Sequence, residues 1–401
     1  MLSSYDEFPI HQLPHPVSIV SNTDPGFDDG YYFGFFSPTE KTFCFMGIRV
    51  NPNTDLVGGY VAFNRDGHQR TVRFSRTWRE LADTQVGPFR IEFLEPFKQI
   101  RLSLTENESG MALDVIWHGS APAFEEAHHW AVNRGRPTTD QTRYSQPGRV
   151  EGWIELDGVR TTVDRETWYA SRDHSWGLYH SKAPMAPNAK WLPPYEPGGI
   201  QRAMRFWTIF GSGELSGFFG FHETADGRQV KMNDTFGTPF EGALYFGWDD
   251  TVELVGARHE LKFDGDKKIL ANATITLVDS DGGEWTQVQT PVTVPWVAQT
   301  MGYDKGSWKD GGSLRTYHGA GTTVEWDEFD FTEQPFTHTM YDGTVLENLV
   351  GREYLMEITT TAPDGRTWTG AGQTEFFLDG PFPRYGITPE AHDVRVRPVD
   401  Y

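Results

Sequence analysis

The chain has 401 residues, enough for two domains of ordinary size that each bury a core. Its net charge of −21 disfavours nucleic acid and anionic membranes as partners, and no apolar run approaches the length of a membrane span. The single cysteine, Cys44, excludes a disulfide framework and a thiolate metal cage. The N-terminus has no secretory signal pattern, so we expect a cytoplasmic protein.

Alternating segments separated by turn residues dominate the chain. Asp-Gly occurs ten times, from Asp29 to Asp379, and favours two-residue hairpin turns because both of its positions tolerate positive φ. Two segments, 76–85 and 121–132, are the only candidates for short helices. Strands with short turns and little helix predict an all-β protein built from sandwiches or up-and-down barrels. Five segments alternate or read as strand–turn–strand: 111–118, 149–164, 218–232, 259–278 and 353–370.

Two pairs of polar residues precede the middle of the chain. Asp114 and His118 share one face of a predicted strand, where either can act as a general base or simply face solvent. Glu125 and His129 have the i,i+4 spacing of a helix, which suits a divalent metal, although a solvated helix face is the favoured interpretation. We therefore expect neither a metal nor a cofactor.

The segment "TWYASRDHSWGLYH", residues 167–180, concentrates the most reactive side chains. It follows the predicted hairpin of 149–164. On an extended strand Arg172 and His174 share one face, while Asp173 and Ser175 share the other. The segment is therefore either an active site or the buried brace of a large β-protein.

A proline-rich stretch divides the chain. Residues 182–199 contain five prolines and end in two glycines, a composition that rarely continues through a sheet. We expect an N-terminal domain over 1–185, a linker over 186–199 and a C-terminal domain over 200–401. The reactive segment then lies at the domain edge, where ligand sites are common.

The segment "TWYASRDHSWG" resembles the Asp-His-x-Trp signature of the hydroxyneurosporene synthase (carotenoid 1,2-hydratase) and AttH-like superfamily, to which kievitone hydratase and certain fungal Diels–Alderases are related. The resemblance covers about residues 144–177. It implies a fold of two consecutive lipocalin-like (calycin) antiparallel β-barrels with few short helices. It also implicates Asp173, His174 and Trp176 in the site.

The chain departs from that family in one respect. Hydratases of the group use an acidic residue on a strand of the second domain, but the corresponding segment, 201–213, offers Trp207 and no carboxylate before Glu214. Carotenoid hydration itself is therefore in doubt, while a related acid-catalysed reaction remains open.

We hypothesise a cofactor-independent hydratase, dehydratase or isomerase that acts on a hydrophobic small molecule between the domains. Asp173 or His174 moves the proton with help from Tyr144 or His118, so His174→Ala and Asp173→Asn are expected to abolish turnover. A non-catalytic carrier of an apolar metabolite and a pericyclase, which needs chiefly a shaped pocket, are the alternatives. The aromatic residues expected to bind the substrate are Trp153, Trp176, Trp207, Tyr317 and Trp326.

Overall fold

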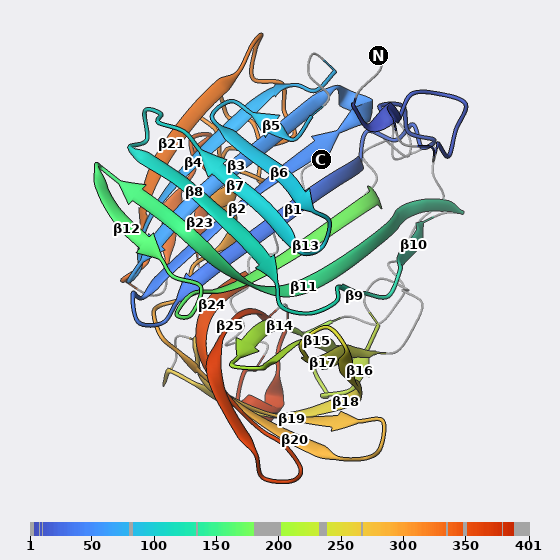
Figure 1. Ribbon diagram of the computed structural model, residues 1–401, viewed down its shortest axis with the longest axis vertical. Helices are drawn as coiled ribbons and strands as arrows, with labels where there is room; N and C mark the ends of the chain where they lie inside the picture. The colour runs from blue at the N-terminus through green and yellow to red at the C-terminus, as the bar shows by residue number, and fades with distance from the viewer. Residues whose placement is uncertain are drawn as a thin grey trace.

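The computed structural model describes residues 4–7, 9, 11–79, 83–133, 135–179, 202–231, 239–265, 268–333, 336–347, 351–378 and 380–388. Within these residues the protein is all-β, with two large antiparallel sheets stacked along the long axis (Figure 1). The predicted fold class, two lipocalin-like barrels, is confirmed.

The upper sheet is curled and open, and we call it the curled sheet. Its main path runs β21-β4-β3-β2-β1-β13-β11-β8-β7-β6-β5, and β9, β10 and β12 pair with β11. Its strands are β1 (Phe27–Ser37), β2 (Thr42–Asn51), β3 (Leu56–Arg65), β4 (His68–Thr77), β5 (Gln85–Val86), β6 (Phe89–Glu95), β7 (Gln99–Leu104), β8 (Met111–Gly119), β9 (Phe124–Glu125), β10 (His129–Asn133), β11 (Arg136–Leu156), β12 (Val159–Val163), β13 (Tyr169–Leu178) and β21 (Thr323–Asp330).

The lower sheet closes on itself, and we call it the closed barrel. Its order is β14-β25-β24-β20-β19-β18-β17-β15, and a further pairing of β14 with β15 completes the ring, with β16 attached to β15. Its strands are β14 (Met204–Ser212), β15 (Leu215–Glu223), β16 (Gln229–Val230), β17 (Phe240–Phe246), β18 (Asp250–Phe263), β19 (Leu270–Asp279), β20 (Glu284–Pro291), β24 (Gly351–Thr361) and β25 (Thr367–Leu378). A separate small hairpin pairs β22 (Thr337–Thr339) with β23 (Val345–Glu347).

Turn chemistry explains several of the hairpins. Asp66-Gly67 and Asp157-Gly158 both adopt positive φ at the tips of β3–β4 and β11–β12, as the Asp-Gly pattern predicted. Asp29-Gly30 is different, because it lies inside β1 and forms no turn. Its two residues matter instead for the site described below.

The helical expectations were wrong. Residues 124–125 and 129–133 form β9 and β10, and residues 76–77 belong to β4, since pairing with neighbouring strands outweighs weak helix propensity. The described helical turns are short 3₁₀ segments: η1 (Ser4–Glu7), η2 (Pro52–Thr54), η5 (Ala298–Met301) and η6 (Pro383–Tyr385). Across the described part of the chain, no helix has the length and apolarity needed to cross a membrane.

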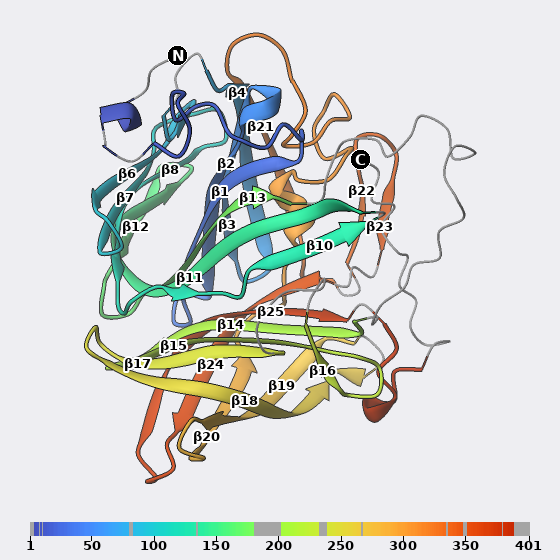
Figure 2. The same ribbon diagram turned by 90° about the vertical axis from the view of Figure 1, so that its right-hand side faces the viewer.

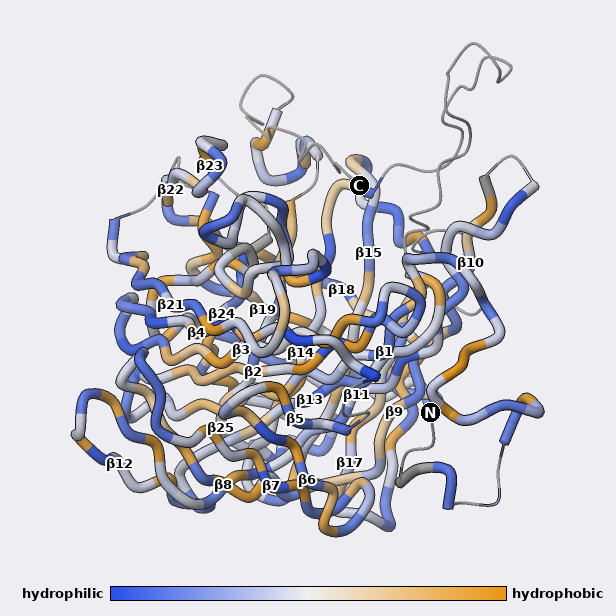
Figure 3. The backbone as a smooth tube through the Cα atoms, turned by 90° about the horizontal axis from the view of Figure 1, so that it is seen from above, coloured by the Kyte–Doolittle hydropathy of each residue, from blue (hydrophilic) through white to orange (hydrophobic). Residues whose placement is uncertain are grey.

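Each sheet encloses its own aromatic and aliphatic core. The curled sheet wraps around Phe33, Trp117 and their neighbours, and the closed barrel around Phe206, Tyr354 and theirs. Hydrophobic colouring follows the central strands such as β2 and β14, whereas the periphery is mostly hydrophilic (Figure 3). The face of the curled sheet that encloses this core is called the inner face here.

One segment of the chain passes from the closed barrel to the curled sheet and back. After β20 the chain leaves the closed barrel, and β21 pairs with β4 at the edge of the curled sheet before β24 returns to the barrel. Strands β1, β11 and β13 lie against β14, β15 and β25 across the interface (Figure 2). The linker predicted at 186–199 lies outside the described residues, so the division into 1–185 and 200–401 stays a prediction.

Candidate functional site

Strand β13 presents its reactive side chains to two different environments. Arg172 lies over the inner-face ring of Trp117, 4.8 Å from its centroid. Asp173 is paired in register with Tyr32 and Ser145, whose side chains face the closed barrel. The alternation predicted from the sequence is therefore present, and we call the second surface the barrel face.

Arg172 is a brace of the inner face. Its side chain is 1% exposed, and Nε and Nη2 donate to Oε1 of Gln146 at 2.9 and 2.7 Å. Aromatic rings surround the guanidinium, and burial lowers its pKa. A cation held in this way fixes β11 to β13 and leaves little room for a ligand.

His174 lies at the rim of the inner face, and each of its two ring nitrogens has a hydrogen-bonding partner. Its Nε2 is 2.7 Å from Oδ1 of Asp29, and its Nδ1 is 3.3 Å from the hydroxyl of Tyr144. Tyr31 stacks on the imidazole at 4.1 Å between centroids, and Trp176 packs beside it at 4.9 Å. The structure thus brings together three predicted site residues, Tyr144, His174 and Trp176. Asp29 was missed because its Asp-Gly pair read as a turn.

The barrel face around Asp173 is polar. Adjacent strands place Arg143, Ser175 and Gly30 in one row, and Ser145, Asp173 and Tyr32 in the next. Among the described residues, the Asp173 carboxylate makes no side-chain hydrogen bond or ion pair, although its side chain is only partly accessible. Burial raises the pKa of Asp173, while the nearby Arg143 opposes that change. A carboxyl group in such surroundings can hold and deliver a proton.

The closed barrel supplies acids from the opposite side. Ser171 donates to Oε1 of Gln373 at 2.7 Å, and Gln373 donates to Oε2 of Glu353 at 2.9 Å, so a hydrogen-bonded chain crosses the interface. Burial raises the pKa of Glu353 well above its usual range, and the carboxylate of Glu375 directly across the strand pair raises it further. Arg205 holds Glu375 at 3.0 Å.

One end of this interface opens into a pocket with about 440 Å³ of free space, including the part open to solvent. Burial raises the pKa of Glu241 to about 7, although the backbone N–H of Ala127 donates to it at 2.7 Å and opposes the change. Burial also lowers the pKa of His222 well below its usual value, which favours the neutral imidazole. The pocket is lined by Glu126, His129, Arg205, Trp207, Phe218, Gly220, His222, Lys231, Pro239 and Glu241.

Of the five aromatic residues predicted to bind the substrate, Trp207 lines this pocket. Its side chain is 5% exposed, and its indole N–H has no hydrogen-bond partner among the described residues. Phe218 packs against it at 5.7 Å between centroids. The pocket therefore offers an apolar wall with an unused donor beside a carboxyl group that titrates near neutrality.

The remaining predicted residues lie elsewhere. His118 is on the outer side of β8, 3.0 Å from exposed Glu151, and Trp153 carries Arg160 on its ring at 3.6 Å. Neither is joined by a described contact to His174 or Asp173.

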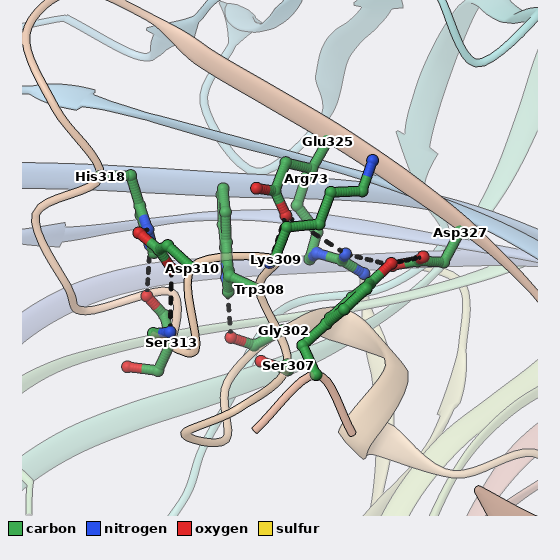
Figure 4. Close-up of polar contacts among 12 residues, drawn as sticks. Arg73, Gly302, Ser307, Trp308, Lys309, Asp310, Ser313, His318, Glu325 and Asp327 are labelled. Atoms are coloured by element: carbon green, nitrogen blue, oxygen red, sulfur yellow. Dashed lines mark hydrogen bonds and ion pairs between the residues drawn. The ribbon is translucent and has the colours of Figure 1, made fainter. Parts of the chain in front are cut away.

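Tyr317 and Trp326 are separated from the site as well. Tyr317 is 57% exposed on a loop, and Trp326 packs with Arg70 at 5.3 Å on β21. The neighbours of Trp326 point the other way, where Asp327 pairs with the buried Arg73 (Figure 4). The structure does not gather the predicted aromatic residues into one pocket.

Sequence reasoning missed the acids of the closed barrel. Glu241, Glu353 and Glu375 come from three separate strands, and no local motif signals that the fold brings them to the interface. Glu125 and His129 were weighed as a helical pair, but they lie on β9 and β10, and it is Glu126 that joins His129 in the pocket. Among the described residues no cluster of three or more His, Cys, Asp or Glu is arranged for a metal.

The chain belongs to a family of unknown function (DUF8625), whose model matches residues 2–365. Among curated proteins, none matches the sequence.

Similar solved structures include kievitone hydratase from Nectria haematococca, at 10% identity and a TM-score of 0.44, covering 94% of this chain and 96% of that one. The complex of CghA with Sch210972 is similar at 10% identity and a TM-score of 0.46, covering 92% and 96%. Likeness at this level concerns the fold alone, and it does not extend to hydroxyneurosporene synthase.

Proposed function

We propose that the protein is a cofactor-independent lyase or isomerase that hydrates, dehydrates or isomerises a small molecule between the curled sheet and the closed barrel. The observation that supports this most is the position of Asp173. Its carboxyl group is partly accessible, has no described hydrogen-bond partner and lies within the electrostatic reach of Glu353 on the opposite sheet.

Acid–base chemistry follows from the two kinds of carboxyl group. In the dehydration direction, Asp173 donates its proton to the leaving hydroxyl, and a second group removes the proton from the neighbouring carbon as the double bond forms. Glu241 suits the second role because a pKa of about 7 lets it accept and return protons at neutral pH. Hydration reverses these steps with water as the nucleophile.

The apolar part of a substrate has a place beside Glu241. Trp207 and Phe218 form one wall of the open pocket, and an indole face stabilises positive charge that develops on carbon. His174, Tyr144 and Trp176 lie on the other face of the sheet, so their role is support of β13 from behind.

Mass spectrometry of organic extracts from the purified protein, followed by incubation with each recovered compound, tests the proposal. Conversion that is lost in Asp173→Asn and Glu241→Gln supports it. Glu284→Gln is the matched control, because Glu284 is exposed and belongs to β20. A recovered compound that wild-type protein leaves unchanged would instead favour a carrier.

A further inference from the structure

A buried cluster of charges lies beside Asp173 on the barrel face. Asp28 is 0% exposed, and its Oδ2 is 2.7 Å from Nη1 of Arg49 and 2.7 Å from Nη2 of Arg315. Two guanidinium groups therefore share one carboxylate, and the Asp173 carboxyl lies within the electrostatic reach of Arg49 without a described hydrogen bond or ion pair to it. Buried charges are normally paired and hydrogen-bonded, so the remaining donors of the two guanidinium groups can take an anion.

The fold builds this cluster from distant parts of the chain. Arg49 extends flat over Gly30, where a Cβ atom would come within 2.8 Å of Cζ, so only glycine leaves it room. Tyr303 lies 5.5 Å beneath the same guanidinium. Arg315 comes from the segment that leaves the closed barrel before β21, 287 positions from Asp28. The cluster thus depends on both halves of the molecule being in place.

Unused hydrogen-bonding atoms surround the cluster. The Nε atoms of Arg49, Arg315 and Arg143 are buried and have no partner among the described residues, and the same holds for Oγ of Ser175 and the side-chain amide of Gln141. An unsatisfied buried polar group is costly, so this many in one place indicate that a polar ligand or water completes them. The three Nε atoms are donors, because each carries a hydrogen and no lone pair, whereas Oδ1 of Asp28 is a buried acceptor without a described partner.

We propose that the Asp28–Arg49–Arg315 cluster binds the carboxylate of an organic acid, which is the substrate class of the site. Guanidinium groups bind carboxylates with charge-assisted hydrogen bonds, and the Nε donors of Arg49 and Arg315 have no described partner. The Asp173 carboxyl lies within the electrostatic reach of Arg49, and Tyr32 lies within that of Glu353 and Asp173. An acid anchored here extends its remaining atoms towards Asp173.

This inference rests on the proposed function for the location of the substrate, but a binding experiment tests it separately. The probes are benzoate and benzyl alcohol, which differ in charge and little in shape, and binding is measured by thermal shift and calorimetry. We expect benzoate to bind and stabilise the wild-type protein and benzyl alcohol to do neither. In Arg315→Met the benzoate affinity falls by at least about tenfold, as expected for the loss of one charge-assisted bond.

Control variants separate the anion site from folding and from chemistry. Arg315→Lys keeps the charge and retains part of the affinity, whereas Arg366→Met, at an exposed arginine of the closed barrel, retains all of it. Asp173→Asn still binds benzoate, so loss of turnover there and loss of binding in Arg315→Met report different groups. Equal binding of the two probes, no binding of benzoate, or unchanged benzoate affinity in Arg315→Met would overturn the anion site while leaving the acid–base proposal standing.

Discussion

Polar side chains on the inner face of β13 are hydrogen-bonded, whereas Asp173 and Ser175 on its barrel face lack described hydrogen-bond partners. On the inner face Arg172 donates twice to Gln146, and His174 is held between Asp29 and Tyr144. On the barrel face Asp173 has no described hydrogen bond, and Ser175 has a buried hydroxyl without a partner. The same four-residue run therefore provides a satisfied brace on one side and unsatisfied groups on the other.

We interpret this difference as one between side chains that hold the strands together and side chains that can contact a ligand. Satisfied buried groups fix strands to one another, whereas an unsatisfied buried group is costly unless a ligand or water completes it. The Asp-His-x-Trp run had suggested one site. The structure instead assigns its residues to two environments, and the following experiments compare them.

The largest expected effect is on turnover of a substrate recovered from extracts. Asp173→Asn removes the proton donor that we propose for the barrel face and should lower kcat about 10²- to 10⁴-fold, the usual contribution of general acid catalysis. His174→Gln should lower kcat less than about tenfold, because its neighbours are on the other side of the sheet. Equal losses in the two variants would contradict the separation of the faces.

Arg172→Ala should be the most destabilising of these changes. It leaves the buried Oε1 of Gln146 without its donors and opens a cavity among aromatic rings, at a cost of about 3 to 4 kcal/mol in the free energy of unfolding. Urea denaturation measures this directly. Arg366→Ala, at an exposed hairpin, should change stability by less than about 0.5 kcal/mol. Similar values for both variants would show that Arg172 is not a brace.

Glu241 of the closed barrel predicts a pH dependence of the free energy of unfolding. Its pKa is about 7 in the folded protein and 4.5 ordinarily, so the folded state retains a proton that the unfolded state loses. Stability contributed by this proton is complete below pH 4.5 and is lost as the pH rises through 7, by at most about 3 kcal/mol.

In Glu241→Gln the loss of unfolding free energy that this group causes as the pH rises from 4.5 through 7 should disappear. The variant should therefore gain stability relative to wild type at pH 8. Urea titrations at pH 5 and pH 8 measure the difference. Glu284→Gln, at an exposed carboxylate, should keep the wild-type change of unfolding free energy between pH 5 and pH 8. A Glu241→Gln variant that also keeps the wild-type change would show that the carboxyl is not protonated on folding.

The smallest effect is expected at Tyr317. Its exposed ring makes no described contact with either face of β13, so Tyr317→Ala should alter both kcat and stability by amounts near experimental error. Steady-state kinetics and thermal unfolding check this. A lower affinity of the variant for the substrate would instead show that Tyr317 contacts the substrate.

The sequence predicted local structure better than the site. Asp-Gly turns such as Asp66-Gly67 depend on backbone preferences of two residues, and the alternation of Arg172 and Asp173 depends on one strand. Glu241 and Arg315 reach the interface only through the closure of the barrel and the return of β21, which are long-range pairings with no short motif. Asp29 was misread because the same dipeptide that forms turns also fits within a strand.

The most direct test is a titration of the Asp173 carboxyl by NMR, with Asp labelled at the side-chain carbon and Asp173→Asn used to assign the resonance. We expect a pKa above the ordinary 3.8, because burial disfavours the charged form more strongly than Arg143 favours it. A pKa at or below 3.8 would mean that Arg143 holds Asp173 as a carboxylate. Asp173 would then be a brace, and the acid–base account would fail.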